Sequence, residues 1–544
     1  MKILWLDINS SYSHSSLAIP ALDAQLDTIT RELHQWRIAK ATLKTDINSL
    51  IDEILEFRPE IILSTAWLFN HSYILNVAQR YKQMKPLCRI VLGGPEFLGD
   101  NLEYLKNHTY IEALFRGEGE ELFPLFIKNI DNKDTCYSLP GFCHINEAGI
   151  YNDNGEAIVK EFATLNSPEK SSFFSWDKPF VQLETSRGCF NNCSFCISGN
   201  KRRVENIALD NIRKRIDNIA ERGIKEIRIL DRTFNADTER AFSMINIFMQ
   251  YSPNIQFHLE VHPAFMSEKI KSVLIDIPAN LLHVEAGIQS LSDEVLKACK
   301  RAGGALPALE GVEFLISTGR NIVHTDLIAG LPYYSFTQLV SDVKKLIKVN
   351  ADEVQLELLK VLPGSNLRTN AEEYGLMYSK YPPYEVLDTP WISHKELSLV
   401  VYISKILDIF FNNTDWRTPF SQLVLQNDSF LTEFSTFFQS KGYTSHLSKE
   451  RVGIILWNFC KERYSQWIPE ITVEWLKQGL SFKKGPGASS LQWKFGDSTA
   501  NPLFDDNTRE NIYRYYTENN KRHWFSYNRK TNNSKSIGYF TEIM

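Results

Sequence analysis

Apolar and polar positions alternate along the chain in two successive series of strands and helices. In the first series, short continuous apolar runs such as residues 3–9 and 89–95 alternate with amphipathic stretches such as residues 47–57 and 72–84. Continuous apolar runs are typical of parallel strands covered on both faces, and a period of about 3.6 residues is typical of the helices that cover them. The pattern predicts a doubly wound α/β domain over residues 1–130, whose ligands bind beyond the carboxyl ends of its strands.

The periodicity breaks between residues 131 and 178, where two clusters of Asn, Asp and Gly are turn signals, and we expect a linking hairpin there. A second series of strands and helices follows. Its predicted strands cover residues 180–185, 226–231, 255–261, 281–288, 321–329 and 353–359. Six strand–helix repeats are too few for a closed eight-fold barrel, so the pattern predicts an open, partial (βα)6 barrel over residues 179–380.

The character of the sequence changes again after residue 380. Helical patterns such as residues 397–411 predominate, and a mainly helical C-terminal domain is predicted over residues 381–544. Its last part is rich in aromatic side chains that are interleaved with Arg514, Lys521 and Arg522. Such interleaving is found in platforms that bind single-stranded nucleic acid. A packed aromatic cap is the preferred interpretation.

The charge and hydropathy of the chain argue against a general nucleic-acid-binding protein and against a membrane-spanning one. The chain has 544 residues with 60 basic and 65 acidic side chains, which gives a formal net charge of -5. This balance argues against non-specific binding of nucleic acid, and the basic run Lys201-Arg202-Arg203 is interpreted as a solvated loop. No run of about 18 uncharged apolar residues is present to span a membrane, and the N-terminal apolar run is too short for a signal peptide. A cytoplasmic protein is expected.

Three of the eight cysteines are clustered. Cys189, Cys193 and Cys196 follow an apolar strand with the spacing C-x3-C-x2-C, whereas the other five are scattered singly and are expected to be small buried hydrophobes. Thiolates hold iron–sulfur clusters, usually four to a cluster, so three thiolates leave one iron free to chelate a substrate. A zinc site is the alternative. It would need a further ligand such as histidine, and no histidine lies between residues 144 and 258.

The cysteine loop, with the aromatic Phe195 before its last cysteine, resembles the signature of the radical SAM superfamily. The resemblance implies a [4Fe-4S] cluster whose open iron binds S-adenosylmethionine (SAM) and cleaves it reductively to a 5′-deoxyadenosyl radical. It also implies a partial TIM barrel. Residues at later strand ends resemble the family's SAM contacts, although the segment after the second strand departs from the family's Gly-Gly-Glu form. The implied SAM contacts are Phe195, Asp231, Thr233, Glu260, Gln289, Ser290, Arg301 and Asp326.

The first domain resembles the Rossmann-like cobalamin-binding module that precedes many radical SAM enzymes. Gly93-Gly94-Pro95 and the run from Arg116 to Glu120 are typical of that module, because glycine lets the backbone approach a bulky flat ligand closely. The implied cobalamin contacts are Ser64, Gly93, Gly94, Pro95 and Glu118. The family's Asp-x-His-x-x-Gly sequence, which places a histidine below the cobalt, is absent. A vestigial domain without cobalamin is the alternative.

The whole chain resembles a bacterial group of B12-binding-domain radical SAM proteins whose tail is a domain of unknown function. The resemblance implies an enzyme that transfers a methyl group through cobalamin to an unactivated carbon of a small-molecule or peptide substrate. It also implies an electron donor such as flavodoxin or ferredoxin. One alternative is a cobalamin-dependent radical rearrangement, cyclisation or ring contraction without methyl transfer. Another is a non-catalytic protein that binds a cluster or cobalamin. No catalytic side chain is identified beyond the cluster.

Overall fold

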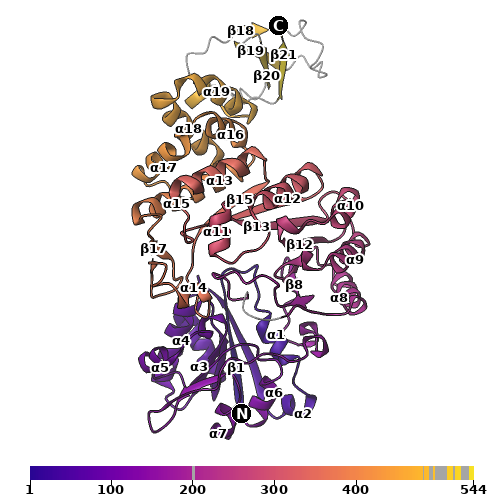
Figure 1. Cartoon of the computed structure of the whole chain (residues 1–544), viewed down its shortest axis with the longest axis vertical. Helices are drawn as coiled ribbons and strands as arrows, with labels where there is room; N and C mark the ends of the chain where they lie inside the picture. The colour runs from indigo at the N-terminus through magenta and orange to yellow at the C-terminus, as the bar shows by residue number, and fades with distance from the viewer. Residues whose placement is uncertain are drawn as a thin grey trace. The chain divides into compact units, whose positions relative to one another are not determined.

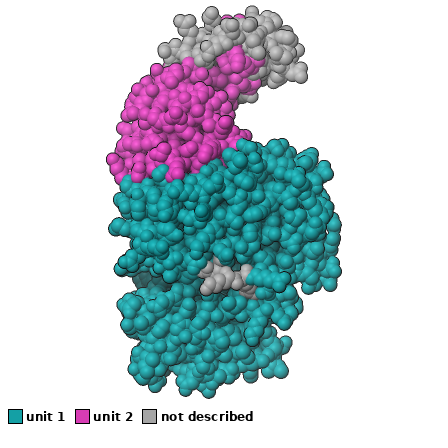
Figure 2. All heavy atoms as spheres, in the orientation of Figure 1, with its two compact units in different colours: residues 1–323, 330–335, 358–394 teal, residues 324–329, 336–357, 395–544 magenta. Residues whose placement is uncertain are grey.

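The computed structural model describes residues 1–198, 203–481, 483–488, 494–496, 511–518, 521–528 and 538–543. These residues fall into two compact units, which Figure 2 shows in different colours. The first unit comprises residues 1–323, 330–335 and 358–394, and the second comprises residues 324–329, 336–357 and 395–544. Lys201 and Arg202 of the predicted solvated loop lie outside the described residues.

The first unit begins with a parallel sheet of the predicted kind. Its parallel strands are β1 (Lys2–Asn9), β2 (Gln35–Thr42), β3 (Ile61–Thr65), β4 (Arg89–Gly93) and β5 (Ala113–Phe115). They lie in the order β2-β1-β3-β4-β5. The six residues inside β1 are all buried, as the continuous apolar run predicts for a strand that is covered on both faces.

Helices cover both faces of this sheet (Figure 1). The buried side chains of α3 (Ile47–Phe57), α4 (His71–Met84) and α5 (Leu102–Asn107) pack in one apolar core. Those of α1 (Ala18–Asp23), α6 (Phe123–Lys128) and α7 (Lys133–Tyr137) pack in a second core. The remaining helix of this region is α2 (Thr28–Glu32). The doubly wound α/β prediction is confirmed.

The predicted linking hairpin is present, but its strands belong to the first sheet. β6 (Phe142–Ile145) pairs antiparallel with β5, and β7 (Tyr151–Asp153) pairs antiparallel with β6. The sheet therefore has seven strands in the order β2-β1-β3-β4-β5-β6-β7. The chain then passes through two short 3-10 turns, η2 (Phe162–Thr164) and η3 (Pro168–Lys170), on its way to the second series.

The second series begins in the first unit with four parallel strands in the order β8-β11-β12-β13. They are β8 (Val181–Leu183), β11 (Glu226–Ile229), β12 (Gln256–Val261) and β13 (Leu282–Gln289). The helices of this part are α8 (Leu209–Glu221), α9 (Thr238–Met249), α10 (Glu268–Asp276), α11 (Asp293–Ala298) and α12 (Ala305–Ser317). Buried and half-buried residues alternate along β12 and β13, so each strand presents one apolar and one more polar face.

The last two repeats consist of β14 (Ile322–Ala329), α13 (Phe336–Lys348) and β15 (Glu353–Leu358), so all six predicted strands are present in chain order. The first unit ends with α14 (Asn366–Thr369) and a two-stranded sheet of β16 (Met377–Tyr378) and β17 (Val386–Asp388).

Most of the second unit is helical. It contains α15 (His394–Ile406), a π-helical turn (Leu407–Phe411), α16 (Arg417–Gln426), α17 (Phe430–Ser440), α18 (Lys449–Arg463) and α19 (Ile468–Lys477). The mainly helical prediction therefore describes this part well. It does not anticipate the four-stranded sheet that follows, with the order β18-β19-β20-β21. Those strands are β18 (Lys494–Gly496), β19 (Asn511–Glu518), β20 (Lys521–Asn528) and β21 (Gly538–Ile543).

Two of the aromatic side chains in that sheet, Trp524 and Phe525, are buried, as the interpretation of a packed cap requires. Among the described helices of either unit, none combines the length and the apolar character needed to cross a lipid bilayer.

Candidate cofactor site

The cysteine loop leaves the second series at the end of its first strand. Two short strands, β9 (Ser186–Arg187) and β10 (Glu205–Asn206), pair antiparallel on either side of the loop and close its base. The guanidinium of Arg240 on α9 bridges the same two chain segments, donating to the carbonyl oxygens of Thr185 (2.9 Å) and Ile207 (3.0 Å). The two ends of the cysteine loop are therefore held together at one base.

Asp231, which follows β11, anchors the first residues of this base. The carboxylate is 3 % exposed and accepts from the backbone N–H groups of Thr185 (2.8 Å) and Ser186 (2.9 Å) at one oxygen. The other oxygen accepts from the Thr185 hydroxyl. Because three buried donors converge on it, the carboxylate holds the chain that leads into the cysteine loop.

Each of the three thiols has a polar contact with another described residue. The hydroxyl of Thr233 lies 3.6 Å from the Cys189 sulfur, and the backbone N–H of Ser198 donates to the Cys196 sulfur at 3.3 Å. The guanidinium of Arg301 donates to the Cys193 sulfur at 3.5 Å. Burial raises the pKa of the Cys193 thiol, and the charge of Arg301 opposes that shift. Two residues predicted to contact SAM therefore lie against the thiols themselves.

The segment that carries Arg301 holds the cysteine loop at further points. The backbone N–H of Ser194 donates to the carbonyl oxygen of Cys299 (2.9 Å), and the N–H of Ala302 donates to the side chain of Asn191 (3.2 Å). Burial raises the pKa of Cys299 to about 12, so this thiol stays protonated at neutral pH, as expected for a buried hydrophobe. The loop is thus fixed to the connection between α11 and α12.

The other predicted SAM contacts lie at strand ends or in the loop. Phe195 is half-buried beside Cys196, and Glu260 lies on β12 opposite Glu285 of β13. Gln289 ends β13 with φ +71°, a conformation that is unusual for glutamine and marks a constrained position. The remaining two are Ser290, which is fully buried, and Asp326, which lies on β14 in the second unit.

A cavity of about 870 Å³ lies within the first unit, and residues of both series line it. All five predicted cobalamin contacts belong to its lining: Ser64, Gly93, Gly94, Pro95 and Glu118. The lining also includes Arg187 and Gly188, which directly precede Cys189. The structure therefore brings the strand ends of the first sheet and the start of the cysteine loop to one cavity.

Gly94 shows how closely the backbone is packed at the floor of this cavity. It has φ +112°, and a Cβ atom there would lie 2.5 Å from the carbonyl oxygen of Ala66. No other residue type fits without a shift of the main chain. The glycine therefore allows the turn after β4 to pass over the end of β3.

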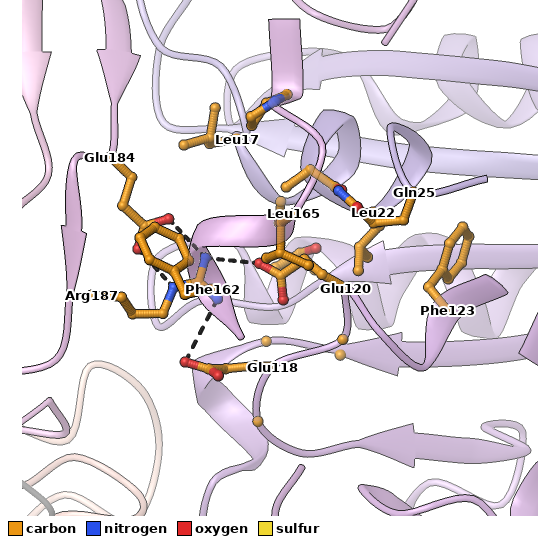
Figure 3. Close-up of a pocket in the computed structure, with 18 of the residues that line it drawn as sticks. Leu17, Leu22, Gln25, Glu118, Glu120, Phe123, Phe162, Leu165, Glu184 and Arg187 are labelled. Carbon is orange, nitrogen blue, oxygen red and sulfur yellow. Dashed lines mark hydrogen bonds and ion pairs between the residues drawn. The ribbon is translucent and has the colours of Figure 1, made fainter. Parts of the chain in front are cut away.

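A cluster of charges stands at the wall of the cavity (Figure 3). The Arg187 guanidinium makes a two-point contact with Glu184 (2.7 and 2.8 Å) and donates to Glu120 at 2.8 Å. The Oε1 atom of Glu118 lies 3.7 Å from Nη1 of Arg187, and the centre of the Phe162 ring lies 4.4 Å from the guanidinium carbon. Burial acts to lower the pKa of Arg187, but the hydrogen bonds of Glu184 and the charge of Glu120 raise it overall. We call Arg187, Glu118, Glu120 and Glu184 the carboxylate cluster.

The carboxylate cluster was not predicted beyond Glu118. Arg187 and Glu120 are separated by 67 residues, and nothing in the local spacing connects them. The sequence signal that could have indicated the cluster is the run Glu118-Gly119-Glu120, in which one carboxylate stands on each side of a glycine after a buried strand.

The residues present fit the expected cofactors. Three thiols on one loop with an N–H, a hydroxyl and a guanidinium beside them suit a cluster, whose sulfur ligands are commonly hydrogen-bonded. The cavity has the size range of small-molecule and cofactor sites and a largely apolar inner wall that includes Trp5, Phe115 and Phe123. Its lining contains no histidine among the described residues, in agreement with the absence of the histidine-bearing sequence.

Two family patterns match the chain. Residues 183–346 match the Radical SAM superfamily, so this part of the protein is a radical SAM domain. Its cofactors are a 4Fe-4S cluster and SAM. Residues 372–484 match a protein family of unknown function, DUF4080. The zinc alternative for the cysteine loop is therefore dropped.

Similar proteins extend the comparison beyond that domain. The chain is 23 % identical over 354 residues to an uncharacterized methyltransferase, PH0819, of Pyrococcus horikoshii, covering 63 % of this chain and 76 % of that one. It is 22 % identical over 365 residues to the cobalamin-dependent radical SAM methyltransferase TokK of Streptomyces tokunonensis, covering 61 % of this chain. The match spans about half of TokK, 52 %.

The fold resembles that of a solved structure. The cobalamin-dependent radical enzyme OxsB, solved with aqua-cobalamin and SAM bound, aligns with a TM-score of 0.59 at 14 % identity. The alignment covers 86 % of this chain and 80 % of OxsB. The likeness supports the predicted order of an α/β domain, a partial barrel and a substantial helical region.

Proposed function

Because residues 183–346 form a radical SAM domain, we propose that the protein is a cobalamin-dependent enzyme that methylates an unactivated carbon of a small-molecule or peptide substrate. One observation carries the proposal. The cavity at the strand ends of the first sheet is walled by Arg187 and Gly188, which directly precede the first cluster cysteine. The names of the similar proteins, two of which are methyltransferases, support the same reading.

The chain's own residues bind and orient. Cys189, Cys193 and Cys196 would hold the cluster, and the cavity would hold cobalamin, with Gly93 and Gly94 allowing close approach of the backbone. When bound, the cluster supplies an electron, SAM a radical and a methyl group, and cobalamin a carrier for that methyl group. The apolar cavity wall would exclude water from these reactive groups.

The carboxylate cluster has a part in this arrangement. Arg187 holds Glu184 and Glu120, and Glu118 accepts from the backbone N–H of Val159 at 2.7 Å, so the three carboxylates stand at fixed positions at the cavity wall. Arg187 itself directly precedes Gly188-Cys189, so its contacts join those carboxylates to the start of the cysteine loop. A ligand in the cavity would therefore be held at a fixed place relative to the cluster loop.

The proposal includes an electron donor such as flavodoxin or ferredoxin, because a low-potential cluster needs a low-potential reductant. It also includes a cytoplasmic location. It leaves nucleic acid out as a substrate, since the net charge of -5 offers no general attraction for phosphate backbones.

The test starts with anaerobic purification from cells supplied with cobalamin, followed by measurement of iron and cobalt per chain and an ultraviolet–visible spectrum. The protein is then reduced with SAM, and 5′-deoxyadenosine, methionine and S-adenosylhomocysteine are quantified. Loss of a methyl group from SAM gives S-adenosylhomocysteine, whereas reductive cleavage gives methionine and 5′-deoxyadenosine. Both product sets are expected from the wild-type protein.

Cys193→Ala is expected to lose iron and 5′-deoxyadenosine, and Cys88→Ala is the matched control because Cys88 is a buried cysteine of the first sheet region. Iron without cobalt after reconstitution in excess cobalamin would refute the cobalamin part and leave the radical SAM domain. Bound cobalt with 5′-deoxyadenosine but no S-adenosylhomocysteine would favour a rearrangement, cyclisation or ring contraction instead.

A further inference from the structure

The three cluster cysteines differ in the charge of their neighbours. Cys196 has a neutral backbone N–H from Ser198, and Cys189 has the hydroxyl of Thr233. That hydroxyl donates to the carbonyl oxygen of Arg232 at 2.7 Å, so its one proton is already engaged by an acceptor other than the sulfur. Among the contacts of the described residues, a cationic donor is found at Cys193 and not at the other two thiols.

Arg301 is held in place by contacts that do not involve the thiol. Its Nη2 atom donates to the carbonyl oxygen of Gly287 on β13. A Cβ atom at Gly287 would lie 3.3 Å from the same Nη2, so the guanidinium packs directly on the strand. The neighbouring Ala302 is fixed to Asn191 of the cysteine loop. The guanidinium is therefore positioned between a strand and the loop, with its Nη1 directed to Cys193.

The surroundings of Cys193 strengthen this contact. Cys193 is 4 % exposed, and a hydrogen bond between a charged donor and a thiolate is stronger where water is excluded. One-electron reduction of a cluster adds negative charge to its iron and sulfur atoms. A fixed cation beside one thiolate stabilises the reduced form more than the oxidised form, and hydrogen bonds to cluster sulfurs are known to set cluster potentials.

We propose that Arg301 is a positioning residue for electron transfer, which raises the reduction potential of the cluster through its contact with the Cys193 thiolate. The step is a one-electron reduction of the cluster by an external low-potential donor, and no bond is formed or broken. The proposal rests on the cluster site of the proposed function. It differs from the predicted role of Arg301 as a SAM contact, because the effect exists before SAM is bound.

The test measures the midpoint potential of the reconstituted cluster without SAM, by anaerobic titration followed by electron paramagnetic resonance of the reduced form. Arg301→Gln removes the charge, and Arg301→Lys keeps it without the planar fork. Arg240→Gln is the matched control, because Arg240 also braces the cysteine loop but its guanidinium donates to two carbonyl oxygens and to no thiol.

Arg301→Gln is expected to make reduction at least tenfold less favourable, which is a shift of about 59 mV to a more negative potential for one electron. Arg301→Lys is expected to lie between Arg301→Gln and wild type, and Arg240→Gln to match wild type. If Arg301→Gln has the wild-type potential without SAM and differs only in its affinity for SAM, the inference is overturned. A wild-type protein that forms no 4Fe-4S cluster would instead overturn the proposed function.

Discussion

Replacement of Asp231 gives the sharpest test of how the cysteine loop is held. Alanine at this position leaves three buried donors without a partner, namely the N–H groups of Thr185 and Ser186 and the Thr185 hydroxyl. A buried donor without a partner costs about 1–3 kcal/mol, so the three together cost about 3–9 kcal/mol. Since a folded domain is stable by only about 5–15 kcal/mol, Asp231→Ala is expected to unfold the base of the loop or the whole first unit.

Asparagine separates the hydrogen bonds from the charge. Its carbonyl oxygen can still accept from both backbone N–H groups, and its amide can donate to the Thr185 hydroxyl, which rotates to accept. Asp231→Asn is therefore expected to cost only about 1–2 kcal/mol, the difference between charged and neutral hydrogen bonds. Thr185→Val, which removes one donor, is the control for a single lost bond.

The assay measures urea unfolding by tryptophan fluorescence and iron per chain after anaerobic reconstitution. Asp231→Ala is expected to lose both stability and iron, and Asp231→Asn to keep most of both. The reasoning is refuted if Asp231→Ala retains wild-type stability and iron. If Asp231→Asn keeps its iron but binds SAM much more weakly, the carboxylate acts on bound SAM, as the resemblance implies for Asp231, in addition to holding the loop.

Three further predictions concern the first unit. Burial raises the pKa of Glu96 to about 7 from 4.5, and its carboxyl accepts from the Tyr384 hydroxyl. The folded state then holds a proton that the unfolded state releases above pH 4.5, so stability falls by up to about 3 kcal/mol as the pH rises from 4.5 to 7. Glu96→Gln is expected to remove this pH dependence of the urea midpoint, and an unchanged slope would contradict the raised pKa. Gly94→Ala is expected to abolish cobalamin binding, measured by absorbance titration, whereas Gly149→Ala, at a positive φ with open space around it, is expected to bind normally. Equal losses in both variants would attribute the effect to backbone strain and not to the cavity. Arg187→Met is expected to cost about 3–5 kcal/mol because it takes the ion-pair partner from the buried carboxylate of Glu120 and from the half-buried one of Glu184, and Arg187→Lys is expected to recover part of the stability and of the cobalamin affinity. Wild-type affinity in Arg187→Met would show that the carboxylate cluster does not organise the cavity.

Elements with signals at both ends could be predicted from the sequence almost to the residue. The helix predicted over residues 47–57 is α3, because Asp46 accepts from the N–H of Ser49 at its start and the chain turns at Arg58 with φ +56° before Pro59. The strand predicted over residues 226–231 ends two residues early, at Ile229. The carboxylate of Asp231 binds the neighbouring segment at that point, and hydrophobic pattern carries no information on such a contact.

The terminal four-stranded sheet could not be predicted, because aromatic side chains crowd β19 and β20 and obscure a period of two. The hairpin of β6 and β7 could be predicted from its turns, but not its attachment to β5, which depends on which sheet edge is free. The contacts of Arg187 with Glu120 and of Arg301 with Cys193 join positions that are 67 and 108 residues apart. Local spacing cannot specify such pairs.

The order of strand ends predicts where a residue lies more reliably than what it touches. Thr233 follows β11 and Arg301 follows α11, and both were expected at the SAM site because the resemblance to the radical SAM family implies SAM contacts at these strand ends. The structure places both at that edge, but against Cys189 and Cys193. A long cationic side chain at the edge can reach a thiolate, a bound carboxylate, or each of them in turn. Since a contact with the thiolate acts on the cluster even without SAM, whereas a contact with the carboxylate requires SAM, the potential measured without SAM separates the two roles before any substrate is known.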